Sequence, residues 1–476
     1  TQKSSDWLVV MYMDGDNNLN DPIFMDMNEV EYGLYQIRNS DGSSFSGFDS
    51  VNVVALWDGA SSFENPDGST GTPQIGNAGT YIYELGGDYD NSTTYTTSSG
   101  YVLSSDTKNL SYTAPWLVGT TQTISTSLPN NAHGELNMGD KQTLINFLNW
   151  VNARYTATNV ILQFSDHGGG PRSVRYVKTA DGRTIKVGDT SGGRALCWDE
   201  TSSSNYLKTK DVSDALQAAG YSPSNKAAMI LMDVCLGSSL EDAYQFKNYA
   251  NYLAASPNNI PGKGLDYVNL MKSFTLNTTI EAVGQKIVED YKKQYGNNTT
   301  LWNNYAQALG YNSYSSITNT NVKQNMEWLG DLGFTTFTIT DLSKIEDVKT
   351  AIDSLCTLLL SNTGKTIYVD ANGYFSPTKT STTRNYVTYL GQHHANIVNI
   401  LSSTTDSYGL DDYIYYKGSY TWLYDIGYIA RMMQYFSTST ITTESSTYSN
   451  ENAWPELNTA ASNLITKLND AIKYSW

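Results

Sequence analysis

The sequence predicts an α/β protein with a largely parallel sheet, helices on both faces of that sheet, and a helix-rich C-terminal region. Over roughly the first 275 residues, short apolar runs alternate with stretches of helical spacing, which is the pattern of parallel strands joined by helices. Beyond them the spacing is mostly helical. The chain has 476 residues, 39% of them hydrophobic, so it can bury a large core and form two or more domains.

The strands of the predicted sheet are apolar runs, expected at residues 7–13, 51–56, 81–85, 159–164 and 227–234. Helical spacing is expected at residues 22–37, 140–155 and 212–219. Asp140 suits the N-cap of the second helix, and Gly220 ends the third. Segments rich in Gly, Ser, Thr and Asn, including residues 88–130, are expected to be surface excursions.

The C-terminal region is predicted from helical spacing at residues 280–295, 345–360, 385–401, 426–436 and 456–474. Only residues 334–342 have the character of a strand there. We therefore expect a sheet domain at residues 1–300 and a helix-rich domain at residues 301–476, with the boundary between 275 and 320.

Two residues that could act together in nucleophilic catalysis lie just past predicted strands. His167 follows the run at 159–164, and Cys235 ends the run at 227–234. Ligands and reactive side chains gather at such strand ends in open α/β sheets, and a thiol beside an imidazole suits nucleophilic catalysis. Taken alone, Cys235 is more simply interpreted as a core residue and His167 as a turn residue. Their shared position and the glycines at 168–170 favour a catalytic pair, with the backbone N–H groups of Gly168 and Cys235 as oxyanion donors.

Asp233 is a candidate for substrate recognition. Side chains alternate along a strand, so Asp233 and Cys235 face the same side. A carboxylate there could pair with an Arg or Lys of a peptide substrate through a charge-assisted hydrogen bond. The alternative is an aspartate that accepts hydrogen bonds from nearby backbone N–H groups.

The chain resembles the clostripain family, cysteine endopeptidases of the caspase-like clan. The matching motifs are ELNMGD (135–140), SDHGGG (165–170), WD (198–199), MDVCL (232–236) and EDAY (241–244), with further likeness at 249–256, 262–264, 337–343 and 424–427. The resemblance implies a caspase-like sheet, a dyad of His167 and Cys235, and a preference for basic residues. The chain departs from the family pattern in two places: Pro171-Arg172 stands where a Trp is common, and Lys263 where many members carry an acid. A lysine near the pocket would weaken its selection of another cation.

Self-activation is expected between the two catalytic residues. Residues 172–194 are rich in Gly, Thr and Asp and carry six basic residues, so we expect an exposed loop that is open to cleavage. The resemblance implies maturation by a cut after a basic residue in this interval, with the two chains staying associated. Lys178 and Arg183 are the leading candidates for the cut, and the uncut loop could occupy the pocket and keep the enzyme latent.

Composition excludes several other classes. The net charge of −17 disfavours nucleic-acid binding, but it would attract cationic substrates and divalent cations. Three cysteines give no disulfide framework; Cys356 is expected in the core, and no role is assigned to Cys197. No apolar run approaches a membrane span. The chain shows no signal peptide and begins like a processed protein. The resemblance to exported bacterial proteases favours a secreted or cell-surface location.

No cofactor requirement and no metal site are predicted from spacing, while calcium dependence is left open. Asp14, Asp16 and Asn18 mimic the opening of an EF-hand loop, but Leu19 and Met25 stand where that loop needs Gly and Glu, so turn and cap chemistry is preferred. The adjacent pair at 393–394 is half of the four histidines and does not make a zinc site.

The predicted function is therefore a secreted cysteine endopeptidase that cleaves after Arg or Lys. The alternative is a catalytically silent surface protein that binds glycans or a host partner through loops rich in its 36 Tyr and 10 Trp. Covalent labelling of Cys235 by a basic peptidyl electrophile would separate the two.

Overall fold

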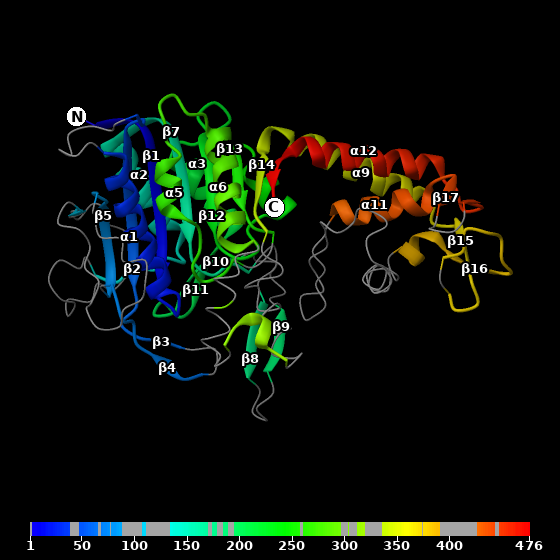
Figure 1. Cartoon of the computed structure of the whole chain (residues 1–476), viewed down its shortest axis with the longest axis horizontal. Helices are drawn as coiled ribbons and strands as arrows, with labels where there is room; N and C mark the ends of the chain where they lie inside the picture. Colours follow the sequence, from blue (N-terminus) through cyan, green and yellow to red (C-terminus); the bar gives the residue numbers. More distant parts are fainter. Residues whose placement is uncertain are drawn as a thin grey trace. The chain divides into compact units, whose positions relative to one another are not determined.

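The structure is a computed structural model (Figure 1) that divides into two compact units, Thr1–Leu342 with Lys473–Trp476, and Ser343–Ile472. The boundary expected between residues 275 and 320 lies N-terminal to this division. The structure describes residues 2–38, 47–64, 68–76, 78–87, 107–110, 134–169, 174–178, 184–188, 195–257, 260–296, 303, 312–318, 336–373, 375–390, 426–442 and 447–476.

The first unit is built on a nine-stranded sheet with the order β19-β14-β13-β12-β7-β1-β2-β5-β6. The five strands from β13 to β2 pair in parallel, whereas β14, β5 and β6 join by antiparallel pairing. The predicted, largely parallel sheet is thus confirmed. Its strands are β1 (Lys3–Gly15), β2 (Val51–Gly59), β5 (Gly79–Glu84), β6 (Lys108–Asn109), β7 (Tyr155–Ser165), β12 (Ala227–Asp233), β13 (Ala250–Ala255), β14 (Thr338–Asp341) and β19 (Ile472–Ser475).

Helices cover both faces of this sheet, as predicted (Figure 1). Alternate residues of β1, such as Met11, pack in one core cluster with Phe24 and Met27 of α1 (Asn20–Ile37). On the other face the ring of Tyr12 lies 6.3 Å from that of Phe147 in α2. The first face also carries α5 (Tyr267–Lys272) and α6 (Ile280–Tyr295), and the second α2 (Lys141–Arg154), which packs on α3 (Thr209–Ala218).

Local capping follows the sequence prediction. The Asp140 side chain accepts a hydrogen bond from the Gln142 N–H at 2.9 Å, which caps α2. Gly220 has a φ of +93° just after α3, a conformation that glycine adopts without steric cost. The short helix α4 (Leu240–Phe246) begins five residues after Cys235.

Short antiparallel hairpins accompany the large sheet of the first unit. They are β3 (Phe63–Glu64) with β4 (Thr70–Gly71), β8 (Val174–Lys178) with β9 (Thr184–Gly188), and β10 (Ala195–Asp199) with β11 (Asn205–Lys208). Single 3₁₀ turns occur at Tyr314–Ser316 and Leu342–Lys344. Across the described part of the chain, we find no helix that is long and apolar enough to span a bilayer.

The second unit is rich in helices, as predicted. Its described elements are α9 (Ile345–Ser361), α11 (Ile426–Ser437), α12 (Pro455–Ala471), the hairpin β15 (Thr366–Val369) with β16 (Thr382–Asn385), and the hairpin β17 (Thr440–Thr442) with β18 (Thr447–Ser449). α12 packs on both α9 and α11. The prediction that Cys356 lies in the core is wrong: the residue is exposed, because α9 buries only the stripe of Ile345, Val348, Ala351 and Leu355.

Three strands of the sheet were not predicted. They are β6, which lies in the segment expected to be a surface excursion, β13 and β19. At β19 we expected helix as far as residue 474, but the helix ends at Ala471. Backbone hydrogen bonds of 2.8 and 3.0 Å between Phe337 and Trp476 hold this C-terminal segment beside β14, so that β19 is the edge strand. The helix expected at 385–401 and the insertion at 88–130 lie mostly outside the described residues.

Candidate functional site

The carboxyl ends of β7 and β12 lie side by side, because the strands pair in parallel with Ser165 opposite Asp233. His167 stands two positions after Ser165, and Cys235 two positions after Asp233. The two predicted catalytic residues therefore leave neighbouring strands at the same edge of the sheet. Parallel α/β sheets carry their chemistry at this edge.

His167 is held by Asn18, which lies between β1 and α1. The imidazole Nε2 is 2.7 Å from the amide oxygen of Asn18. Because that oxygen can only accept, Nε2 carries the hydrogen and Nδ1 is left to accept a proton. The ring lies edge-on to that of Trp198, with 6.4 Å between centroids. Burial lowers the pKa of His167 to about 4, so the imidazole is neutral at neutral pH, as a general base must be.

Cys235 lies in a turn that follows β12. Its sulfur accepts a hydrogen bond from the Ile260 N–H at 3.4 Å and lies 3.8 Å from the Ile260 carbonyl oxygen. The next residue, Leu236, has a φ of +60°, a left-handed conformation that is uncommon for residues with a side chain. The thiol is thus half-buried at a sharp bend rather than enclosed in the core.

Gly168 brings the two strand exits into contact. A Cβ atom built on Gly168 would lie 1.9 Å from the carbonyl oxygen of Cys235 and 2.9 Å from its backbone N and C. Gly168 also forms an isolated bridge with Leu196 of β10. Only glycine permits this approach. The two residues named as oxyanion donors, Gly168 and Cys235, therefore have their backbones packed together.

Asp233 is buried and engaged by two donors. Its Oδ2 accepts hydrogen bonds from the Leu265 N–H at 3.1 Å and from the Tyr267 hydroxyl at 2.8 Å. The Tyr267 oxygen in turn accepts from the Gln163 amide at 2.7 Å. Burial raises the pKa of Asp233 to about 6. One carboxylate oxygen of Asp233 therefore accepts a hydrogen bond from a backbone N–H group, which was the alternative to substrate recognition.

Lys263 lies among buried acids near Asp233. Its ammonium forms an ion pair of 3.4 Å with Glu29 of α1, whose side chain is 6% exposed. Asp26, on the same helix, has a pKa raised well above its ordinary range by burial and by the charges of Asp233 and Glu29, while Lys263 acts in the opposite direction. The lysine thus compensates part of the negative charge around Asp233.

We expected the candidate cleavage segment, residues 172–194, to be an exposed loop, but part of it forms strands. β8 and β9 form an antiparallel hairpin in which Lys178, the last residue of β8, pairs with Thr184. The loop prediction is wrong for these strands, because their Val and Ile residues favour extended backbone. Arg183 lies outside the described residues, as do Pro171, Arg172 and the pair His393-His394.

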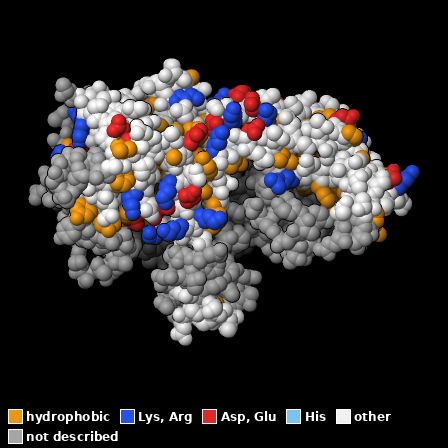
Figure 2. All heavy atoms as spheres, turned by 45° about the horizontal axis from the view of Figure 1, so that its top comes forward, with side chains coloured by type: hydrophobic (Ala, Val, Ile, Leu, Met, Phe, Trp, Pro, Cys, Tyr) orange, Lys and Arg blue, Asp and Glu red, His pale blue; other side chains and the backbone are white. Residues whose placement is uncertain are grey.

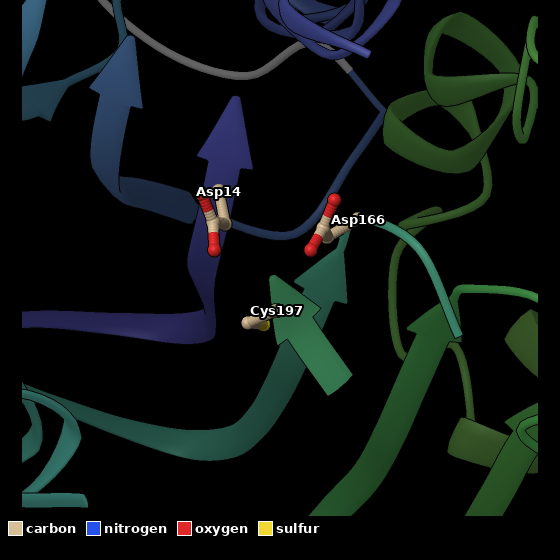
Figure 3. Close-up of side chains that lie close together, drawn as sticks. All are labelled: Asp14, Asp166 and Cys197. Atoms are coloured by element: carbon tan, nitrogen blue, oxygen red, sulfur yellow. The ribbon is translucent and has the colours of Figure 1, made fainter. Parts of the chain in front are cut away.

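A group of carboxylates that the sequence did not bring together lies at the same edge of the sheet. One oxygen each of Asp16, Asp58, Glu135 and Asp199 lie within 4.8 Å of one another. Beside them, the side chains of Asp14, Asp166 and Cys197 converge from β1, from the exit of β7 and from β10 (Figure 3). We call the first four residues the carboxylate cluster. They were missed because each comes from a different segment, although Asp14 and Asp16 were noted as a failed EF-hand motif.

The carboxylate cluster is strongly perturbed. Burial raises the pKa of Asp16 to about 8 and that of Glu135 to about 7, and it raises the pKa of Asp58 well above the ordinary range. Neighbouring carboxylates raise these values further. On the face drawn in Figure 2, basic and acidic side chains are interspersed, whereas these acids are wholly or largely enclosed. The formal negative charge of the chain therefore counts enclosed acids whose raised pKa values favour the uncharged form.

Comparison with known proteins identifies the family. The model of the clostripain family, peptidase family C11, matches residues 11–475. Clostripain of Hathewaya histolytica is 24% identical over 372 residues, which cover 75% of this chain and 57% of clostripain. The chain thus spans less than two thirds of the length of this relative.

Two solved structures are also similar. One is a secreted C11 cysteine protease from Bacteroides thetaiotaomicron in complex with an irreversible peptide inhibitor, at 19% identity, 74% and 70% coverage of this chain and of that chain, and a TM-score of 0.42. The other is an inactive zymogen C11 protease from Parabacteroides distasonis, at 14% identity, 100% and 85% coverage, and a TM-score of 0.48. Because the family model matches almost the full length, this chain belongs to the clostripain family.

Proposed function

We propose that this chain is a cysteine endopeptidase that cleaves peptide or protein substrates after Arg or Lys, with Cys235 as nucleophile and His167 as general base and acid. The observation that carries the proposal is the position of the two residues. Each stands two positions past the end of a strand, and the two strands, β7 and β12, pair in parallel. Membership of the clostripain family supports the same activity.

In the proposed reaction the Cys235 sulfur attacks the substrate carbonyl carbon while its proton passes to Nδ1 of His167. The backbone N–H groups of Gly168 and Cys235 stabilise the oxyanion. His167 then protonates the leaving amine as the C–N bond breaks, which leaves a thioester. Water attacks that thioester with His167 as base, and cleavage of the C–S bond restores the thiol. Asn18 orients the imidazole throughout, by fixing Nε2 as the protonated nitrogen.

A preference for basic residues is supported by the acids buried around Asp233, namely Asp26 and Glu29. Lys263 sets a limit on that preference, because its ion pair with Glu29 removes part of the attraction for a second cation. We propose Asp233 as the acid that contacts the substrate, through the carboxylate oxygen that does not accept from Leu265 and Tyr267.

Self-cleavage in the connection between β8 and β9, after Lys178 or Arg183, would divide the chain between the two catalytic residues. The products would stay associated, because β7 and β12 would still pair in the centre of the sheet and α2 would still pack on α3. We further propose that the protein acts outside the cell, consistent with its acidic, Tyr-rich composition.

The test is covalent labelling followed by intact-mass measurement. A peptidyl electrophile that ends in Arg or Lys should add one equivalent to wild type and none to Cys235→Ala. Cys356→Ala, which removes an exposed thiol, is the matched control and should label fully. An electrophile that ends in Leu should react much more slowly. A wild-type protein that resists the basic probe would overturn the proposal and favour the binding-protein alternative.

A further inference from the structure

A buried polar group lies under the candidate site, on a face of the sheet that is otherwise apolar. Ile161 of β7 and Leu231 of β12 belong to the core cluster of that face. Because side chains alternate along a strand, Gln163 and Ser165 point to the same face as Ile161, and Asp233 to the same face as Leu231. These three polar residues are at most 7% exposed. Buried polar groups are costly unless they are hydrogen-bonded, so the partners of these residues are informative.

The Tyr267 hydroxyl of α5, a helix that covers this face (Figure 1), joins the three polar residues. It donates to Asp233 Oδ2 at 2.8 Å and accepts from the Gln163 amide at 2.7 Å. It also lies 3.4 Å from the Ser165 hydroxyl. We call Gln163, Ser165, Asp233 and Tyr267 the Tyr267 network. Its central hydroxyl is fully buried and contacts both strands that lead to the proposed catalytic residues.

Hydrogen bonding in the Tyr267 network runs in one direction. The Gln163 N–H donates to the Tyr267 oxygen, and the single hydrogen of that hydroxyl is given to Asp233. Burial raises the pKa of Asp233 to about 6, whereas the bonds from Tyr267 and from the Leu265 N–H act in the opposite direction. The network therefore favours an ionised Asp233 where burial alone favours the neutral acid.

The segment before Tyr267 closes around the same carboxylate oxygen. The Leu265 N–H donates to Asp233 Oδ2 at 3.1 Å, and the Tyr267 N–H donates to Glu29 at 3.1 Å. Gly264 has a φ of +66°, and a Cβ atom built on it would lie 2.6 Å from Asp233 Oδ2. Every hydrogen bond that Asp233 receives from described side chains and from this segment goes to Oδ2. Oδ1 is therefore the oxygen left for a ligand.

Other titratable groups lie around Asp233. Asp26 of α1 interacts with it by charge repulsion, which raises the pKa of Asp26. Glu29, on the same helix, is paired with Lys263 at 3.4 Å. From α6, Tyr291 lies close enough for Asp233 to contribute to its raised pKa. None of these four groups donates a hydrogen bond to Asp233, so the two donors described above hold its carboxylate in place.

We propose that Tyr267 is a specificity-determining positioning residue, whose hydroxyl holds Asp233 Oδ2 so that Oδ1 is presented to the cationic side chain of the substrate. This inference rests on the part of the proposed function in which Asp233 contacts the basic residue. The Tyr267 hydrogen and the substrate cation would then bind different oxygens of one carboxylate, and both interactions are charge-assisted. Loss of the hydroxyl should reduce recognition of a cation and leave the attack of Cys235 on the carbonyl carbon intact.

The experiment compares two peptide substrates that differ only in charge, one with Arg before the scissile bond and one with citrulline, the uncharged isostere of Arg. Tyr267→Phe keeps the ring and removes the hydroxyl. At pH 7 we expect kcat/KM on the Arg substrate to fall by about fivefold or more, and that on the citrulline substrate to change by less than about twofold. Because the lost donor favours the neutral acid, the midpoint near pH 6 of the Arg profile should rise by about one pH unit or more.

Tyr291→Phe is the matched control. The Tyr291 hydroxyl is buried and has no hydrogen-bond partner in the described part of the chain, so its removal should leave both kcat/KM values and the Arg profile unchanged. Gln163→Met is the second variant. It removes the donor to Tyr267 together with a carbonyl oxygen that lacks a partner among the described residues, and it should lower kcat/KM on the Arg substrate by a smaller factor. The Tm of each preparation is measured, and Gln163→Met decides the question if Tyr267→Phe does not fold.

Equal losses on the Arg and citrulline substrates, or an unchanged ratio of the two kcat/KM values, would overturn the inference and assign the Tyr267 network a structural role. Calorimetric binding of both peptides to Cys235→Ala separates this outcome from failure of the proposed function. If wild type cleaves neither peptide, but Cys235→Ala prefers the Arg peptide and loses that preference with Tyr267→Phe, the positioning role stands and the proposed activity fails. If wild type cleaves both peptides equally well, Asp233 does not recognise the cation and the inference is refuted.

Discussion

The substitution Gly168→Ala tests the candidate site most directly, because it changes the closest contact between the two strand exits. The added Cβ would lie 1.9 Å from the carbonyl oxygen of Cys235. Nonbonded carbon and oxygen atoms normally stay about 3.3 Å or more apart, so the backbones beyond His167 and Cys235 must separate by about 1.4 Å, the difference between that distance and 1.9 Å. The clashing atoms are backbone, so a side-chain rotation at Cys235 cannot relieve the contact.

The expected result is a large loss of activity with a retained fold. A misplacement of about 1 Å in a catalytic site lowers the rate on the order of 100-fold. That factor corresponds to about 2.7 kcal/mol of lost transition-state stabilisation. The strain should destabilise the fold by about 1–3 kcal/mol, which the chain can tolerate.

The assay compares kcat/KM on a peptide amide ending in Arg with the Tm of the same preparation. Gly364→Ala is the matched control, since no atom lies within 4 Å of the added Cβ at that position. It should match wild type in both measurements. A Gly168→Ala enzyme with wild-type kcat/KM would refute the claim that the contact between Gly168 and Cys235 sets the geometry of catalysis.

Three further predictions address ionisation, selectivity and maturation. Because the pKa of His167 is held at about 4, kcat/KM on a substrate without a basic residue should stay level as the pH falls from 7 to about 5 and should decrease through about 4, where the base becomes protonated; a decrease centred at 6.5 on that substrate would contradict the burial argument. On a substrate with Arg, kcat/KM should also decrease through about pH 6, where Asp233 becomes protonated. Asp233→Asn should cost about 2 kcal/mol or more on substrates with Arg and much less on neutral ones, whereas equal losses would assign Asp233 a structural role. Purified wild type should acquire a new N-terminus after Lys178 or Arg183 that the nucleophile variant lacks, and an active chain that is never cut would exclude latency.

Local pattern was sufficient for β1, β7 and β12 at the centre of the sheet, but not for β6 and β19 at its two edges, nor for β13. The runs at 7–13, 159–164 and 227–234 are apolar on both sides, as strands covered by helices must be, so they could be recognised without knowledge of their partners. β19 has no such signature. It is a strand because Trp476 and Phe337 exchange backbone hydrogen bonds across 139 positions, and no local pattern records that pairing.

The candidate site shows the same difference between residues that local pattern identifies and residues whose contacts are long-range. His167 and Cys235 could be found because each follows a recognisable strand. Asn18 could not, because its contact with His167 joins residues that are 149 positions apart. A weaker signal for the carboxylate cluster was present, since Asp16 follows β1 and Asp58 lies near the end of β2. These two strand ends could have been considered together once a parallel sheet was predicted, whereas Asp199 belongs to the separate hairpin of β10 and β11.

The two groups at this edge of the sheet also affect each other electrostatically. Ionised carboxylates favour the protonated form of a nearby histidine, so an uncompensated cluster would tend to keep His167 as an imidazolium that cannot accept the thiol proton. Burial lowers the pKa of His167 to about 4, which favours the neutral imidazole. The carboxylate cluster meets this condition through its own ionisation. Burial raises the pKa values of Asp16, Glu135 and Asp58, which favours their uncharged forms and leaves His167 neutral and able to accept the thiol proton.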